Sequence, residues 1–192
     1  MNIHFPWKNH RKGALIIRFK FTYIVIMVII FSFSLDCFAG ELESRYAVIT
    51  YFDHDDLRKF NNELYMGRLK HQIKKSRSDT IEDEVIAKID FIVEKVMVVL
   101  DMFPQQLKFS IAIHPGEREV QKDFRKIYNV DVNYIAFYSP SVNRVFYSAN
   151  NAHLRVVTHE IGHVVAENYF KISPPQRIHE VIAQFAEQHI TD

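Results

Sequence analysis

The sequence contains a single cysteine, Cys37, in a chain of 192 residues. One cysteine cannot form a disulfide within the chain, and Cys37 lies in an N-terminal segment that we expect to be removed from the mature protein. The expected mature chain therefore has no thiol nucleophile and no cysteine ligand for zinc. A core of apolar side chains has to hold the remaining roughly 150 residues together, and this length is sufficient for one domain.

The chain also lacks a strong excess of charge of either sign. Its formal net charge is +1, from 24 basic and 23 acidic residues. Five of the basic residues and one acidic residue fall within residues 1–39, so the rest of the chain has 19 basic and 22 acidic residues and a charge of about −3. Such a balance provides no electrostatic footprint for nucleic acid, so we expect no nucleic-acid partner.

No apolar run has the length of a typical membrane span. The run FTYIVIMVIIFSFSL, residues 21–35, is shorter than the about 20 residues that a helix needs to cross a bilayer. It follows a basic stretch and precedes Cys37 and Ala39, which suit positions −3 and −1 of a signal peptidase site. We therefore predict a signal peptide over residues 1–39, cleavage near Ala39 and export to the periplasm or the exterior. The alternative is an anchor formed by residues 21–35, which would keep the protein on a membrane.

Hydrophobic periodicity in residues 40–192 predicts one α+β domain, with strands mostly early and helices late. The longest helix pattern, residues 79–103, has Asp79 as its expected N-cap and Pro104 as its stop. The expected strands are residues 45–52, 107–113, 133–138 and 144–148. The other expected helices are residues 53–66, 118–128, 151–170 and 175–190.

The stretch VVTHEIGHVV, residues 156–165, contains the strongest functional signal. On a helix, His159 and His163 lie one above the other, and the aliphatic residues cluster roughly 160° around from them. Two neutral imidazoles one turn apart can both reach a zinc ion at about 2.0–2.1 Å. Glu160 projects roughly 100° from His159, where it is better placed to contact a water than to share the coordination. Since HExxH also occurs by chance, a third ligand is needed to support a metal site.

Glu180 is the best candidate for that third ligand. Metzincins would place a histidine at position 169 and a glycine at position 166, but these residues are Tyr169 and Ala166. The turn FKISPP reverses the chain into an αα-hairpin, and His163 and Glu180 each lie about 10 Å from this turn. They are therefore expected side by side. The apolar face of the last helix is expected to comprise Ile178, Val181, Ile182 and Phe185, opposite Glu180, Ala183, Gln184 and Glu187.

HExxH followed after sixteen residues by Glu180 resembles the gluzincins, the thermolysin-like zinc metallopeptidases. PPQRIHEVIAQFAE is similar to their glutamate helix, and the compact size resembles the single-domain minigluzincins. The resemblance implies that His159, His163 and Glu180 bind one Zn²⁺ and that Glu160 is the catalytic base. It also implies a small mixed sheet packed on helices, with substrate extended along an edge strand near residues 144–148.

The sequence departs from the family pattern in two ways. An aspartate that orients a ligand histidine is replaced by Gln184, whose carbonyl could accept the same ring N–H. Larger relatives also carry a helical subdomain with an oxyanion-stabilising side chain. We expect such a group upstream here, and the candidates are Tyr147, Tyr138, His153 and Tyr169.

Two further polar residues of the last helices are expected to have supporting roles. His179 points roughly 100° away from Glu180, so we do not expect it to be a ligand. Glu167 lies one helical turn after His163, on the same side of the helix. It is expected at the surface or as a residue that contacts and orients a ligand.

The function expected from these features is that of an exported, monomeric zinc metallopeptidase that hydrolyses proteins or peptides. One alternative is a zinc-bearing but non-hydrolytic domain that captures a partner chain by strand addition. Another is an interaction domain without a metal.

Overall fold

The computed structural model describes residues 40–73 and 80–192. The predicted signal peptide, the alternative anchor and the expected N-cap Asp79 all lie outside the described residues. None of the helices in the described ranges combines the length and the apolar character that crossing a membrane requires.

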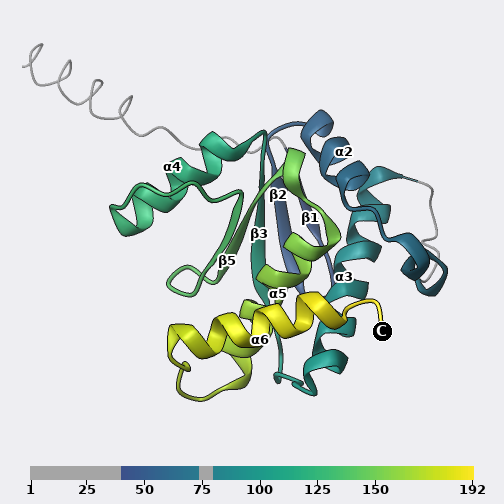
Figure 1. Ribbon diagram of the computed structural model, residues 1–192. Coiled ribbons are helices and arrows are strands. Elements are labelled where there is room, and N and C mark those ends of the chain that lie inside the picture. Colours follow the sequence, from purple (N-terminus) through teal and green to yellow (C-terminus); the bar gives the residue numbers. More distant parts are fainter. Residues whose placement is uncertain (1–39, 74–79) are drawn as a thin grey trace, which may run out of the picture. The chain divides into compact units, whose positions relative to one another are not determined.

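The centre of the fold is a five-stranded mixed sheet (Figure 1). The three inner strands run parallel to one another, and each outer strand pairs antiparallel with its neighbour. In spatial order the strands are β1 (Gly40–Glu43), β2 (Ala47–Tyr51), β3 (Phe109–His114), β5 (Arg144–Ser148) and β4 (Ala136–Ser139). The expectation of a small mixed sheet in an α+β domain is therefore confirmed.

Five helices and two short 3₁₀ turns surround this sheet in the described residues. The helices are α2 (His54–Glu63), α3 (Ile81–Leu100), α4 (Glu117–Tyr128), α5 (Leu154–Tyr169) and α6 (Gln176–His189). The 3₁₀ turns are η1 (Gly67–Gln72) and η2 (Ala149–Asn151). Figure 1 shows α4 apart from α2 and α3, with the sheet between them.

The two faces of the sheet bury different sets of side chains, because successive residues of a strand point to opposite faces. Ile111 and Val145 belong to the main core, which also contains the buried residues of α2, α3 and α5. Phe137 and Phe146 point to the other face, where they pack with residues of α4. Helix α4 thus covers one face of the sheet. Helices α2, α3 and α5, the last of which contains the HExxH segment, cover the other face.

Helix α3 begins one residue later than the sequence pattern indicates. Thr80 is its N-cap, and the Thr80 hydroxyl accepts a hydrogen bond from the Asp83 backbone N–H at 3.2 Å. The helix ends at Leu100 because Asp101 adopts the left-handed conformation, with φ of 51°. Its apolar stripe forms core as expected around Val85, but Phe103 lies beyond the helix and is exposed.

The edge strand near the HExxH helix is β4 rather than the segment 144–148. Strand β5 pairs in parallel with β3 through Ser110–Arg144 and in antiparallel fashion with β4 through Ser139–Arg144. It is therefore an inner strand with neighbours on both sides. The expectation of an edge strand at residues 144–148 is wrong, and the edge of the sheet next to β5 belongs to Ala136–Ser139.

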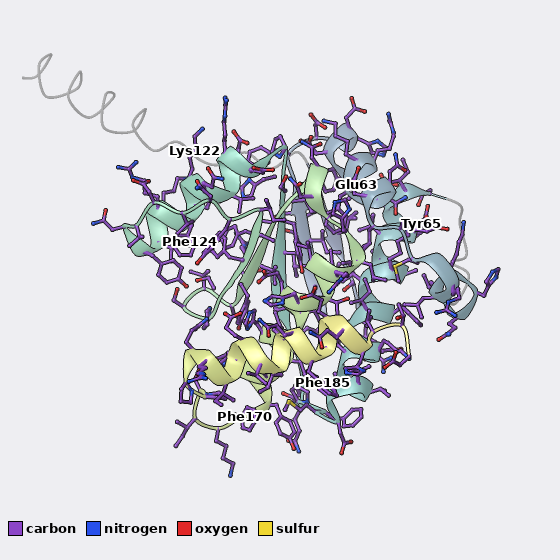
Figure 2. The ribbon with its side chains drawn as sticks, in the orientation of Figure 1. Glu63, Tyr65, Lys122, Phe124, Phe170 and Phe185 are labelled. Atoms are coloured by element: carbon purple, nitrogen blue, oxygen red, sulfur yellow. The ribbon has the colours of Figure 1, made fainter. Side chains whose placement is uncertain are left out.

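Helix α6 turns a different face inward from the one that its large apolar residues indicate. Ile178, Val181 and Phe185 are between 47% and 57% exposed, whereas Ala183 and Ala186 are buried. Figure 2 shows Phe185 and Phe170 on the side of α6 away from the sheet. The small inward face allows α6 to pack closely on α5.

Candidate metal centre

The two histidines of the HExxH segment lie on the side of α5 opposite its buried aliphatic face. Val157, Ile161 and Val164 on this aliphatic face are fully buried. The His159 and His163 rings lie edge to face with their centroids 4.9 Å apart. Both side chains are partly accessible, with exposed fractions of 21% and 12%.

A glycine sets the distance between α5 and α6. A Cβ atom at Gly162 would lie 2.9 Å from the Ala183 Cα, closer than real Cβ contacts allow. The backbones of the two helices therefore meet at Gly162, and only a residue without a side chain fits there. This close approach brings α6 within reach of the two histidines.

The Glu180 carboxylate lies beside both histidine rings. Glu180 Oε2 is 3.5 Å from His159 Nε2, and Glu180 Oε1 is 3.7 Å from His163 Nε2. The three potential ligand atoms all lie within 4.8 Å of one another. The expected position of Glu180 next to the histidines is thus the position that it occupies, and the three side chains could hold a metal ion.

The partner of the first histidine is Glu187, not Gln184. His159 Nδ1 lies 3.1 Å from Glu187 Oε2, and Arg155 Nε donates to Glu187 Oε1 at 2.9 Å. Donation from Nδ1 leaves His159 Nε2 unprotonated and directed at Glu180. Gln184 is exposed to solvent, so its expected role in orienting a ligand histidine is wrong.

The sequence contains a signal for Glu187. It follows Glu180 by seven residues, or about two helical turns, so both project from the same face of α6. The position of Gln184 is instead rotated toward solvent. Neither Glu187 nor Arg155 was expected to contribute to the centre.

Glu160 is almost fully buried beside the three potential ligands, with an exposed fraction of 8%. Burial raises the pKa of Glu160 to about 8, because a low-dielectric environment disfavours the charged carboxylate. The backbone N–H of Tyr138 on β4 lowers this pKa, while the negative charge of Glu180 raises it further. The group is therefore poised to exchange a proton near neutral pH.

Only one of the expected oxyanion-stabilising candidates lines the cavity at the centre. The Tyr138 side chain lines it, and its hydroxyl donates to Asn143 Oδ1 at 3.0 Å. Burial, followed by the charge of Glu167, raises the pKa of Tyr138 above its usual value.

The other three candidates lie elsewhere, which corrects their expected role. Tyr147 is fully buried, and its hydroxyl donates to the Val157 carbonyl at 3.1 Å. His153 is largely exposed and pairs with Glu63 Oε2 at 3.2 Å, while Tyr169 packs against the Phe170 ring. Aromatic side chains on a strand, such as Tyr147, commonly serve packing.

A second polar pair joins α5 to α6 beside the potential ligands. His179 Nε2 lies 3.0 Å from Glu167 Oε2, and the Ser173 hydroxyl donates to the same oxygen at 2.7 Å. The His179 ring is 5.8 Å from the His163 ring, centroid to centroid. His179 and Glu167 therefore pair with each other and support the hairpin, as expected for residues that are not ligands.

The centre opens into a cavity of about 740 Å³. Helices α5 and α6 line it on one side with His159, Glu160 and Glu180. Strand β4 and the C-terminal part of α4 line the other side, so groups from both faces of the sheet meet in one cleft.

Comparison of the chain with protein-family models, with curated proteins and with solved structures finds no match. Its function therefore has to be inferred from the chemistry of this centre.

Proposed function

We propose that this protein is a zinc-dependent metallopeptidase of the gluzincin type, a small single-domain member of that class. The observation that carries the proposal is the convergence of His159 Nε2, His163 Nε2 and the Glu180 carboxylate. In a tetrahedral site with bonds of about 2.0–2.2 Å, ligand atoms lie roughly 3.4 Å apart. Each Glu180 oxygen has one histidine near this spacing, with Oε2 3.5 Å from His159 Nε2 and Oε1 3.7 Å from His163 Nε2.

The kind of donor atom favours zinc. Two imidazoles and one carboxylate form a set that catalytic zinc sites use with the fourth position open. A site for calcium or magnesium would consist mainly of oxygen atoms. Bound at such a centre, zinc supplies Lewis-acid chemistry that acidifies a water molecule and polarises a carbonyl oxygen.

Glu160 would act as the general base, and its burial beside the three potential ligands supports this role. It would take a proton from the attacking water and then deliver it to the leaving amine nitrogen. Its pKa of about 8 lies near neutral pH, and a positive charge nearby would lower that pKa. Glu187 and Arg155 would keep the His159 ring in the orientation that ligation requires.

Strand β4 offers the backbone groups to hold an extended substrate. Ser148 N donates to the Ile135 carbonyl, so by the alternation of an antiparallel pair the polar groups of Ala136 and Tyr138 point away from β5. A peptide could pair with these groups by strand addition. It would then lie directly beside Glu160, and since the Tyr138 N–H already faces the Glu160 carboxylate, the groups left for pairing are those of Ala136 and the Tyr138 carbonyl.

The sequence features of residues 1–39 support export as part of the same proposal. An exported peptidase of this kind would act as a monomer on proteins or peptides outside the cytoplasm. Its only expected cofactor is one zinc ion.

The experiment that tests the proposed function measures hydrolysis of an unfolded protein by the full chain, with and without a metal chelator. Cleavage should require zinc. Glu160→Gln should abolish hydrolysis while the amount of bound zinc stays the same, because the base is not a ligand. Gln188→Ala, at an exposed position of α6, is the control and should leave both quantities unchanged.

Three results would contradict parts of the proposal. Cleavage by Glu160→Gln at the parental rate would contradict the assignment of the base. Zinc binding without hydrolysis by the parental chain would favour the non-hydrolytic binding domain. Absence of zinc binding would remove the proposed centre itself.

A further inference from the structure

Three aromatic side chains form the wall of the cleft opposite the metal centre. We call Phe124, Tyr128 and Tyr134 the aromatic wall. The Phe124 ring centroid lies 4.7 Å from that of Tyr128 and 5.1 Å from that of Tyr134. All three residues line the same cavity as His159 and Glu160.

The aromatic wall is held in place by the sheet and by α4. Phe124 packs edge to face on Phe137 of β4, with ring centroids 5.0 Å apart. The Tyr128 hydroxyl lies 2.8 Å from Ser139 Oγ, which ties the end of α4 to the end of β4. The positions of the rings are therefore set by contacts with the edge strand.

The outer part of the aromatic wall is nevertheless accessible. Tyr128 and Tyr134 are 39% and 48% exposed, although both belong to a packed cluster. Large aromatic side chains gain most from burial, and two neighbouring rings beside a site are suited to receive an apolar group.

The charged side chains of the cleft bear on which ligand group the aromatic wall can receive. Among the described residues that line the cavity, Glu160, Glu167 and Glu180 are acidic and none is lysine or arginine. The metal ion of the proposed centre would offset part of this negative charge at its ligands, but the aromatic wall itself provides no cation, so a carboxylate there would be desolvated without a partner. An uncharged apolar group meets no such penalty.

The geometry of strand addition directs part of a bound peptide toward this wall. Alternate side chains of a strand point to opposite faces of the sheet. For a peptide paired with the outer edge of β4, every second side chain would point to the face that α4 covers. The aromatic wall lies on that side of the edge.

We propose that the aromatic wall is the specificity-determining subsite of the cleft. It takes one bulky apolar side chain, aromatic or leucine-like, of a polypeptide that pairs with β4. This inference rests on the proposed function for the nature of the substrate, and it adds which kind of side chain of that substrate the cleft selects.

The test uses internally quenched peptides in which one position at a time, on either side of the scissile bond, carries Phe, Leu, Ala or Asp. At one position kcat/KM should be at least about tenfold higher for Phe or Leu than for Ala, as expected for an apolar subsite. Asp at that position should be the poorest residue. A flat profile at every position would overturn the proposal.

Substitutions link the preference to the wall. Tyr134→Ala should reduce kcat/KM for the Phe peptide about tenfold and leave that for the Ala peptide unchanged. Tyr134→Phe, which keeps the ring, should restore the preference. Tyr65→Ala is the matched control, because Tyr65 is an exposed tyrosine on the opposite side of the domain from Phe124 (Figure 2). A preference that survives Tyr134→Ala and Tyr128→Ala together would overturn the assignment.

Binding of the same peptides to Glu160→Gln, measured by fluorescence anisotropy, separates the two proposals. Zinc-dependent cleavage with no preference for an apolar residue would refute the subsite and leave the peptidase standing. Tyr134-dependent binding of the Phe peptide, without cleavage by the parental chain, would refute the peptidase and support the subsite. Neither cleavage nor binding would refute both.

Discussion

Helices α3 and α6 both carry large apolar residues, but they use them in opposite ways. Val85, Ile89 and Ile92 of α3 are fully buried in the main core. In α6 the large residues Val181 and Phe185 are about half exposed, and the buried positions are filled mainly by alanine and His179.

The difference shows that the two helices are positioned by different interactions. Burial of large side chains holds α3, and this contribution grows with the apolar area removed from water. Close backbone packing at Gly162, the Arg155–Glu187 ion pair and the contact of Glu167 with His179 hold α6. Stability should therefore depend most on α3, and the geometry of the proposed metal centre most on α6.

Ile89→Ala should have the largest effect on stability. Removing a fully buried isoleucine side chain leaves a cavity and should lower the free energy of unfolding by about 2–5 kcal/mol. Denaturation in urea measures the change. Val98→Ala on the same helix is the control, because Val98 is 62% exposed and its truncation should change stability by at most about 0.5 kcal/mol. Equal effects of the two substitutions would contradict the burial argument.

Gly162→Ala should damage both stability and the centre. The added methyl group would lie 2.9 Å from the Ala183 Cα, so α6 has to move, at a cost of about 1–3 kcal/mol. Because Glu180 moves with α6, zinc affinity should fall as well, which a competition titration would measure.

Gly116→Ala is the matched control for this substitution. Its Cβ would meet Glu119 at an ordinary distance of 3.6 Å, and Gly116 is not among the residues that line the cavity. Zinc affinity should stay unchanged. Unchanged affinity in Gly162→Ala as well would mean that the close helix contact does not position Glu180.

Glu187→Ala tests the polar link between α5 and α6. Loss of the acceptor for His159 Nδ1 should weaken zinc binding by about 10–100-fold, as is typical when such a supporting group is removed. The fold should remain intact, as judged by circular dichroism. Gln184→Ala, at the position first expected to serve this role, should have no effect. The reverse pattern would restore Gln184 to that role.

The sequence was sufficient to predict the features that depend on helix periodicity. The aliphatic stripe of α3 follows from a 3.6-residue repeat, and so does the position of the α5 histidines opposite the aliphatic face of that helix. The position of Glu180 beside His163 follows from their equal distances from the turn of the hairpin. These features are local, so neighbouring residues determine them.

Features that depend on contacts between distant elements were not predictable in the same way. The pairing of β5 with β3 joins Arg144 to Ser110, and nothing in either segment specifies that partner. The inward face of α6 depends on Gly162 in another helix. The sequence of α6 alone predicts that its large apolar residues face inward. Glu187 was missed for the same reason, because its partner lies on α5.

The smallest effect on stability is expected on the outer face of α6. Phe185→Ser removes a large apolar side chain, yet that side chain is 48% exposed. The change in the free energy of unfolding should therefore be within about 0.5 kcal/mol, in contrast to Ile89→Ala. A loss comparable to that of Ile89→Ala would show that this face packs against more of the chain than its exposure indicates.

Zinc stoichiometry is the most direct measurement of the metal centre. The full chain, equilibrated with zinc and separated from free ion, should retain one zinc ion per chain by elemental mass spectrometry. Glu180→Ala should lose most of that zinc, while Gln184→Ala, one turn along the same helix, should retain it. Zinc bound equally well by the parental chain and by Glu180→Ala, or no zinc bound by the parental chain, would contradict a centre built from His159, His163 and Glu180.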